Sequence, residues 1–240
     1  MFHQQPYDET VTETISVPRR RVRDLPRLHL QLMLALTFST GIIDAVGYLG
    51  LDRVFTANMT GNVVILGMGL AGADDLPVLG PVLALVAFMA GAVAGGRALR
   101  GRTGEWTRAT TWLLAAVGAV VLALGLGLMV WHDPPEPALL SVTTLLGAVM
   151  GLQAAAARAL GVKDVTTVVV TSTITGLSMD SRLAGGRGDL WGRRVLAVVL
   201  ILAGAGVGAV LLNVHLGAGL VAAAAVCLVC AGIGHRHARA

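Results

Sequence analysis

Two short polar segments of the sequence could form a binding site, because they repeat one pattern of hydroxyl side chains and glycine. The first is Thr56-Ala-Asn-Met-Thr-Gly61 and the second is Thr171-Ser-Thr-Ile-Thr-Gly176. Each is too short or too polar for an ordinary membrane-spanning helix, and each follows one long apolar stretch and precedes two more. Interrupted apolar segments at matching places in two halves of a chain are typical of transporter binding sites. We therefore predict that both segments contribute to one site.

Backbone N–H groups are the chemistry that these segments would offer. A helix that begins at Thr60 or Thr175 leaves its first amides without intrahelical partners and points the positive end of its dipole at the site. Two such helix starts would bind an anion or a solute rich in acceptors. The β-branched run 166–170 is typical of extended chain leading into such a helix. The alternative is that both segments are ordinary short helices whose threonine hydroxyls bond back to their own backbone.

Asp44 is an ionisable residue well inside the first apolar stretch. A carboxylate near the middle of a bilayer costs at least about 2.5 kcal/mol on insertion scales, so it should face a partner or water. One interpretation is a carboxylate that couples transport to a proton or cation. The other is a structural cap for the segment 54–72. The residues leave both roles open.

The remaining site candidates are side-chain amides and glycines. Asn58 and Asn62 flank the first Thr-Gly pair with groups that donate and accept, and the glycines permit close approach. Gln153 lies in the second-half stretch equivalent to that of Asp44, where an interhelical hydrogen bond is the favoured alternative. The predicted substrate-binding residues are Asp44, Thr56, Asn58, Thr60, Gly61, Asn62, Gln153, Thr171, Thr173, Thr175 and Gly176.

The sequence lacks the motifs of an enzyme or a metal site. Cys227 and Cys230 lie inside an apolar stretch with no further ligand nearby, so we expect buried thiols and neither zinc nor a disulfide. P-loops, nucleophile elbows and HExxH boxes are absent. An intramembrane enzyme would need a nucleophile or paired carboxylates, which Asp44 alone does not supply. We predict no enzymatic activity, no metal and no cofactor.

The composition is that of a membrane protein. Of 240 residues, 55% are hydrophobic and 13% are charged, whereas globular domains average about 25% charged residues. The net charge is +4, but the arginines flank apolar runs and act as topology signals. We therefore predict the lipid bilayer as a partner and no binding to nucleic acid.

Six stretches are long enough to cross a hydrocarbon core, which takes about 20 residues. Two shorter segments, 54–72 and 165–181, follow the first and the fourth stretch. Residues 1–27 are predicted to be a disordered cytoplasmic tail without the apolar region of a signal peptide. The six predicted spans are 28–50, 76–98, 109–131, 138–160, 193–213 and 216–234.

Arginine and lysine positions predict the topology, with both termini in the cytoplasm. If 54–72 crossed the membrane fully, the arginines between 97 and 108 would lie outside, so we expect both short segments to be broken or re-entrant. Units 28–131 and 138–234 then cross three times each, and the second unit is inverted relative to the first. The predicted fold is one all-α integral membrane domain of six transmembrane helices and two re-entrant segments in an inverted 3+3 repeat.

Two stretches of the first half carry a resemblance to a known family. Phe38-Ser-Thr-Gly-Ile-Ile-Asp-Ala-Val-Gly-Tyr48, followed by Val54-Phe-Thr-Ala-Asn-Met-Thr-Gly-Asn62, resembles the YoaK family of bacterial membrane proteins, a family of unknown function. The second-half elements Gly151-Leu-Gln153 and Thr171 to Gly176 also match. The resemblance implies a multi-pass protein of the bacterial inner membrane and supplies no substrate. Family members often have Gln-Asn after the second-half glycine, whereas Ala154 follows Gln153 here.

The predicted function is that of a small-solute permease or secondary transporter of the bacterial inner (plasma) membrane. The expected ligand is an unknown small solute, with an anion favoured by the two helix starts. At this chain length, a homodimer would hold the moving half steady. The alternative is a non-transporting membrane scaffold or sensor that buries the two segments as packing.

Overall fold

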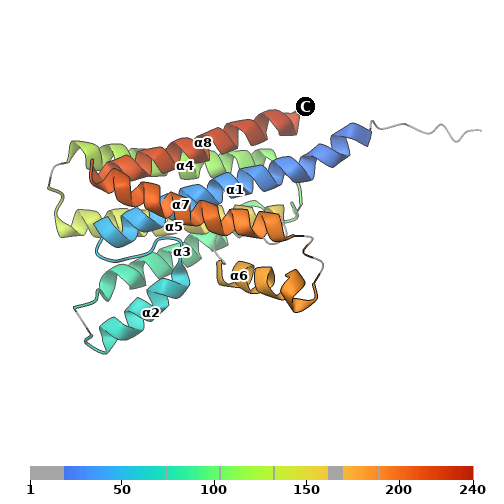
Figure 1. Cartoon of the computed structure of the whole chain (residues 1–240). Coiled ribbons are helices and arrows are strands. Elements are labelled where there is room, and N and C mark those ends of the chain that lie inside the picture. Colours follow the sequence, from blue (N-terminus) through green and yellow to red (C-terminus); the bar gives the residue numbers. More distant parts are fainter. Residues whose placement is uncertain are drawn as a thin grey trace, which may run out of the picture.

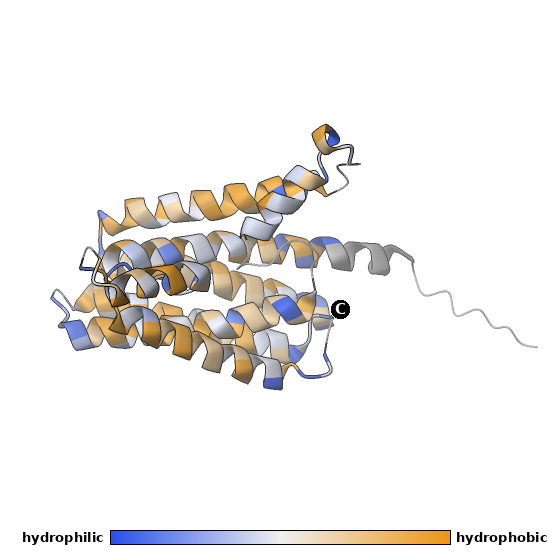
Figure 2. Cartoon of the chain, turned by 90° about the horizontal axis from the view of Figure 1, so that it is seen from below, coloured by the Kyte–Doolittle hydropathy of each residue, from blue (hydrophilic) through white to orange (hydrophobic). Residues whose placement is uncertain are grey.

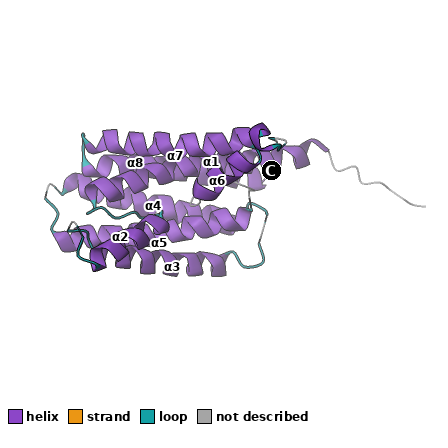
Figure 3. Cartoon of the chain, turned by 60° about the horizontal axis from the view of Figure 1, so that its bottom comes forward, coloured by secondary structure: helices purple, strands orange, loops and turns teal. Residues whose placement is uncertain are grey.

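The computed structural model describes residues 19–239 except 74, 103, 132, 162–169, 187 and 189, and side chains from residue 27 onward. Throughout these residues the regular structure is helical and no strand occurs (Figure 3). The predicted all-α fold is therefore confirmed. The elements are α1 (Arg19–Gly50), α2 (Met59–Leu70), α3 (Leu79–Ala98), α4 (Arg108–Val130), α5 (Glu136–Leu160), α6 (Val170–Met179), the 3-10 turn η1 (Arg182–Ala184), α7 (Trp191–Leu212) and α8 (Leu216–Arg239).

Six of these helices are long and apolar enough to cross a membrane, and they match the six predicted spans to within a few residues. Apolar residues run along the long helices, while polar residues gather at their ends and in the loops (Figure 2). The predicted tail is wrong in its second part, because α1 already begins at Arg19. Arginine and leucine are strong helix formers, so the basic segment extends the first helix beyond its apolar part. Residues 1–18 lie outside the described residues.

α1 is the central helix of the bundle. Its side chains Met33, Leu36, Ile43 and Val46 are wholly buried. Of its most apolar window, 72% is buried within the protein, compared with 17% for α7. α1 therefore supplies much of the core, whereas α7 turns most of its surface outward.

Small residues bring α3 and α5 into backbone contact, with the two helices running parallel. Gly91 of α3 lies against the carbonyl of Ala148, and Gly95 lies against Leu152 and Ala155 further along α5. A Cβ atom at Gly91 would overlap the Ala148 carbonyl oxygen. Glycine at such a crossing lets two helix backbones approach closely in an apolar environment.

The packing of α7 on α1 repeats this pattern. Gly204 of α7 lies against the carbonyl of Phe38, and Gly208 lies against Ile42 and Ala45, so these helices also run parallel. The third extensive contact, between α4 and α8, is antiparallel. Each of the three helix pairs joins a helix of the predicted first unit to one of the second unit, so the two units interleave.

The short helices α2 and α6 lie on the same side of the bundle and run toward opposite ends of it (Figure 1). α2 packs on α3, and α6 packs on α7 and η1. With 12 and 10 residues, they are about 18 Å and 15 Å long at about 1.5 Å per residue. Neither can cross a hydrocarbon core of about 30 Å alone. The predicted extended run 166–170 lies outside the described residues except for Val170, the first residue of α6.

Candidate functional site

A cavity of about 540 Å³ lies where α1 meets the starts of both short helices. α1 contributes Asp44 and Tyr48, and α7 contributes Ile201. The first residues of α6, Val170 and Thr171, face residues of α2 and of the limb 51–58 that precedes it. Residues from both halves of the chain therefore line one cavity.

Five of the eleven predicted site residues line this cavity: Asp44, Asn58, Thr60, Gly61 and Thr171. The other six are not among its described lining residues. Sequence reasoning missed the aromatic and aliphatic lining residues, although Tyr48 follows Asp44 by four positions and therefore lies on the same face of α1. The missed residues are Tyr48, Phe55, Ala57, Val64, Ile65, Val170 and Ile201.

Asp44 holds the limb 51–58 against α1. Its Oδ1 atom accepts hydrogen bonds from the N–H groups of Thr56 at 3.0 Å and Ala57 at 2.8 Å. The side chain is 9% exposed and also lines the cavity. Hydrogen bonds to a charged group contribute about 1.5–3 kcal/mol each. The capping role, one of the two that the sequence left open, is therefore present.

Hydrogen-bond acceptors of the protein already bind several backbone amides around the start of α2. The helix begins at Met59, one residue before the predicted start at Thr60, and the side chain of Asn58 accepts a hydrogen bond from the Gly61 N–H at 3.3 Å. Together with the two N–H groups held by Asp44, three amides around this helix start have partners. The expectation of unpaired first amides is therefore wrong for Met59, which donates to the Ala57 carbonyl at 3.1 Å, and for Gly61, because amides away from water take the nearest acceptor.

Asn62 positions the limb instead of lining the cavity. Its Oδ1 accepts a hydrogen bond from the Phe55 N–H at 2.8 Å, and its Nδ2 donates to the Phe55 carbonyl. The Phe55 ring stacks on Tyr48 with centroids 4.9 Å apart and an interplanar angle of 23°. Thr56 is also buried, and its hydroxyl has no hydrogen-bond partner among the described residues. Asn62 is therefore a supporting residue of the wall that Phe55 and Tyr48 form, and Thr56 is a buried residue of the limb.

α6 begins earlier than the sequence predicts. Its first residue is Val170, so the predicted helix start at Thr175 is wrong. Tertiary context overrides the weak helix propensity of β-branched residues, and the Thr-Gly pair does not break the helix. Thr60 and Thr171 are each the second residue of their helix, and both line the cavity. Thr175 instead bonds back to the Thr171 carbonyl at 2.9 Å, as in the alternative interpretation.

The absence of a side chain at Gly176 leaves space for the Arg194 guanidinium. The Arg194 guanidinium of α7 donates to the Gly176 carbonyl at 2.7 Å and to Asp180 at 2.5 Å. A Cβ atom at Gly176 would lie 2.9 Å from the Arg194 Cζ atom. Thr173 is the buried residue of α6. The bond to Gly176 therefore attaches α6 to α7, and neither Gly176 nor Thr173 is among the described lining residues of the cavity.

Gln153 belongs to a polar cluster in the core. Its Nε2 donates to the Thr40 hydroxyl at 3.0 Å, and its Oε1 lies 3.5 Å from the Cys227 thiol, which is 3.3 Å from Ser39. The interhelical hydrogen bond favoured by the sequence is thus confirmed. Cys227 and Cys230 are buried thiols, as predicted.

Metal ligands do not gather in the described part of the chain. Among the described residues, no three or more His, Cys, Asp or Glu side chains lie together in a group that could hold a metal ion. The described cavity wall therefore offers one carboxylate, three hydroxyls including the Tyr48 phenol, one amide and two aromatic rings.

Comparison with known proteins gives a relative and a family. The chain is 32% identical over 150 residues to the UPF0700 transmembrane protein YoaK of Bacillus subtilis (strain 168). This alignment covers 62% of the chain and 65% of the relative, so it spans less than two thirds of the relative's length. No solved structure matches. The model of the family described as "Protein of unknown function (DUF1275)" matches residues 32–233, a range that contains the whole cavity lining. With its six apolar spans, the chain is a multi-pass membrane protein that belongs to the DUF1275 family.

Proposed function

We propose that this protein moves a small solute across the bacterial inner membrane, as a permease or secondary transporter. The carrying observation is that two short helices, one from each half of the chain, begin at one cavity of about 540 Å³. They run from it toward opposite ends of the bundle (Figure 1). Non-helical backbone at membrane depth persists where it is covered by protein or lines a wet cavity. A solute site between two such helices is the arrangement that alternating access uses.

We also propose that the two units form an inverted repeat. α1 packs on α7 through Phe38 and Ile42, and α5 packs on α3 through Ala148 and Leu152. Phe38 corresponds to Ala148 and Ile42 corresponds to Leu152, and the two residues of each pair are 110 positions apart in the sequence. Gly91 corresponds in the same way to Gly204. Each unit contains three long helices, so corresponding helices of the two units cross the membrane in opposite directions. Equivalent packing of helices that run in opposite directions supports a two-fold axis in the membrane plane. Transport would then alternate access to the cavity between the two sides of the membrane.

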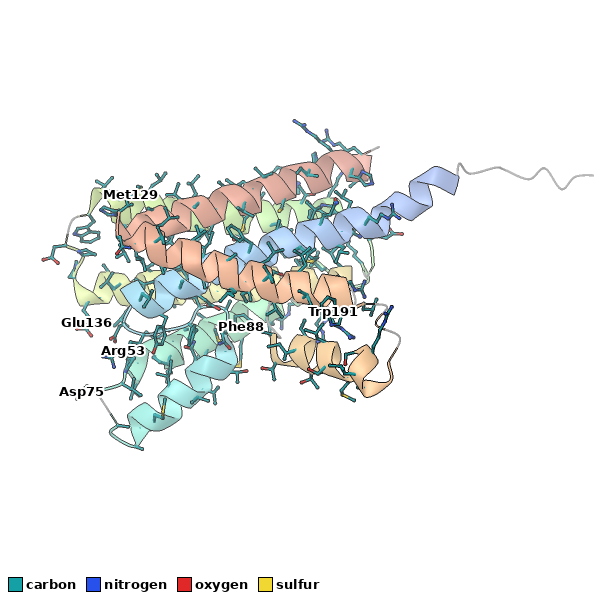
Figure 4. The ribbon with its side chains drawn as sticks, in the orientation of Figure 1. Arg53, Asp75, Phe88, Met129, Glu136 and Trp191 are labelled. Atoms are coloured by element: carbon teal, nitrogen blue, oxygen red, sulfur yellow. The ribbon has the colours of Figure 1, made fainter. Side chains whose placement is uncertain are left out.

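The proposed orientation has both termini in the cytoplasm. Asp75 and Glu136 lie at one end of the bundle and Trp191 lies at the other (Figure 4). The loops at the Trp191 end carry many arginines, including Arg102 and Arg182, which favours the cytoplasmic side.

We further propose a homodimer that contacts through α7. The outward face of this helix is apolar, with Leu202 71% and Val210 65% exposed. A fixed contact along α7 would steady each subunit during the movements of transport. Counting subunits by stepwise photobleaching of labelled protein in lipid vesicles measures this, and one step per particle would contradict it.

Transport is tested in proteoliposomes. A thermal-shift screen of the purified protein against amines, amino acids, sugars and carboxylates selects a stabilising compound, and uptake of that compound in labelled form is then measured. We expect Asp44→Asn and Thr60→Val to reduce uptake at least about tenfold, because each alters a polar group of the cavity wall. Asp52→Asn is the matched control, since Asp52 is exposed and does not line the cavity.

Three outcomes would count against the proposal. Full uptake by both cavity variants would place the solute path elsewhere. A compound that stabilises the protein but is never taken up would point to a sensor, and no stabilisation by any compound would point to a scaffold.

A further inference from the structure

We propose that the cavity selects a small alkylammonium ion, held between the Asp44 carboxylate and the rings of Tyr48 and Phe55. This inference rests on the proposed function, since it assigns a chemical class to the solute of the same cavity. It replaces the anion that the sequence favoured.

The charge of the wall is the first reason. Asp44 is the only carboxylate among the described lining residues, and these include no lysine, arginine or histidine. The buried Arg194 is bound to Asp180 and to the α6 backbone, and does not line the cavity. An anion would therefore meet an acid with no opposite charge nearby in the described wall, whereas a cation would meet a counter-ion.

The hydrogen bonds at α2 are the second reason. The amides of Thr56 and Ala57 are held by Asp44 and the Gly61 amide is held by Asn58, so these three are not available to an anion. A carboxylate offers about four acceptor positions over its two oxygens. The backbone N–H groups of Thr56, Ala57 and Asn58 interact with this carboxylate and still leave acceptor capacity for the N–H groups or the charge of a ligand.

The aromatic wall is the third reason. Tyr48 lies one helical turn beyond Asp44, and its stacked partner Phe55 is fixed through its backbone by Asn62. Aromatic faces attract cations, and they do so most strongly away from water. The neighbouring aliphatic lining residues Val64 and Ile201 suit the methyl groups of an alkylammonium ion, while Thr60 can bond a polar substituent.

Three ligands of one shape test the inference. Choline, its neutral carbon analogue 3,3-dimethylbutan-1-ol and the anion 3,3-dimethylbutanoate differ mainly in charge. Their binding to the purified full chain is measured by titration calorimetry in detergent micelles. We expect choline to bind at least about tenfold more tightly than the neutral analogue, and the anion to bind more weakly than either. Equal affinities, tighter binding of the anion or no binding of choline would overturn the inference.

Variants then test whether the Asp44 carboxylate causes the preference for the cation. Asp44→Asn is expected to reduce the choline preference at least about tenfold, whereas the control Asp52→Asn should keep it. Phe55→Leu is expected to weaken choline more than the neutral analogue, because it removes a ring face and keeps an apolar side chain. If Asp44→Asn does not fold, the ligand series on the unaltered chain and on Phe55→Leu still decides.

The inference and the transport proposal fail separately. Choline binding without uptake into proteoliposomes would support the cation site and count against transport. Uptake of the neutral or anionic compound without any preference for choline would support transport and overturn the cation site.

Discussion

At the scale of single residues, Asp44 is both a structural acceptor and part of the cavity wall. The N–H groups of Thr56 and Ala57 donate hydrogen bonds to its Oδ1 atom, while the side chain also lines the cavity. A unit charge at about 4 Å from an opposite charge gains about 4 kcal/mol at an effective dielectric constant of 20. One carboxylate can therefore stabilise the fold and still discriminate strongly between ligands of different charge.

Mutation separates the two roles. Asp44→Ala is expected to lower the free energy of unfolding by roughly 2–6 kcal/mol, because two buried N–H groups lose their acceptor at about 1–3 kcal/mol each. Asp44→Asn keeps an acceptor oxygen and should lose less than half of that amount. Thermal unfolding in detergent micelles measures both variants against the control Asp52→Asn. Equal losses in the alanine and asparagine variants would assign the stability to the charge and not to the hydrogen bonds.

At the scale of helices, close glycine crossings decide how the long helices pair. Gly91 and Gly204 each face a backbone carbonyl of the neighbouring helix, whereas Gly96 and Gly206 of the same helices face open space. The protein thus offers a matched control within each helix.

We expect Gly91→Ala and Gly204→Ala to lower the free energy of unfolding by about 1–3 kcal/mol each, the usual cost of overpacking. Gly96→Ala and Gly206→Ala should be neutral or stabilise by up to about 1 kcal/mol, because alanine favours helix and meets no neighbour there. Thermal unfolding of the four variants measures the difference. Equal behaviour of the facing and open positions would mean that these crossings do not govern stability.

The long helices could be predicted from sequence, whereas the ends of the short ones could not. The apolar length needed to cross a bilayer fixes a span almost by itself, so all six were found. The start of α6 was misplaced by five residues, at Thr175 in place of Val170. Propensity cannot place such an end when tertiary contacts decide it. For the same reason the apparent pairing of Thr60 with Thr175 gave way to a pairing with Thr171, one helical turn earlier.

The candidate site was predicted in its polar part and missed in its apolar part. Asp44 stood out because an isolated acid in an apolar stretch requires a reason. Tyr48 and Phe55 did not stand out, because an aromatic residue near the end of an apolar helix is ordinary. Their meeting depends on the return of the limb to α1, which Asn62 and Asp44 enforce through backbone hydrogen bonds.

At the scale of the whole molecule, the arrangement of the two short helices makes a prediction about exposure in the cell. Asp75 follows α2 and is exposed (Figure 4). Arg182 follows α6 and is also exposed. Under the proposed orientation these positions lie on opposite sides of the membrane.

Cysteine labelling in intact cells tests this. Asp75→Cys is expected to react with a membrane-impermeant maleimide from outside, and Arg182→Cys only after the membrane is permeabilised. The native Cys227 and Cys230 are 0% and 2% exposed, so the parent chain should give little background. Labelling of Asp75→Cys only after permeabilisation would contradict the inverted arrangement.

The interleaving of the two units also bears on how the chain is made. When the ribosome has released residues up to the loop after α4, neither α1 nor α3 has met its extensive parallel neighbour, because α7 and α5 are still to come. Early spans must therefore wait in the bilayer as loosely associated segments until synthesis is nearly finished. It follows that two fragments cut between α4 and α5 would each be short-lived alone, and would rescue one another when produced in the same cell.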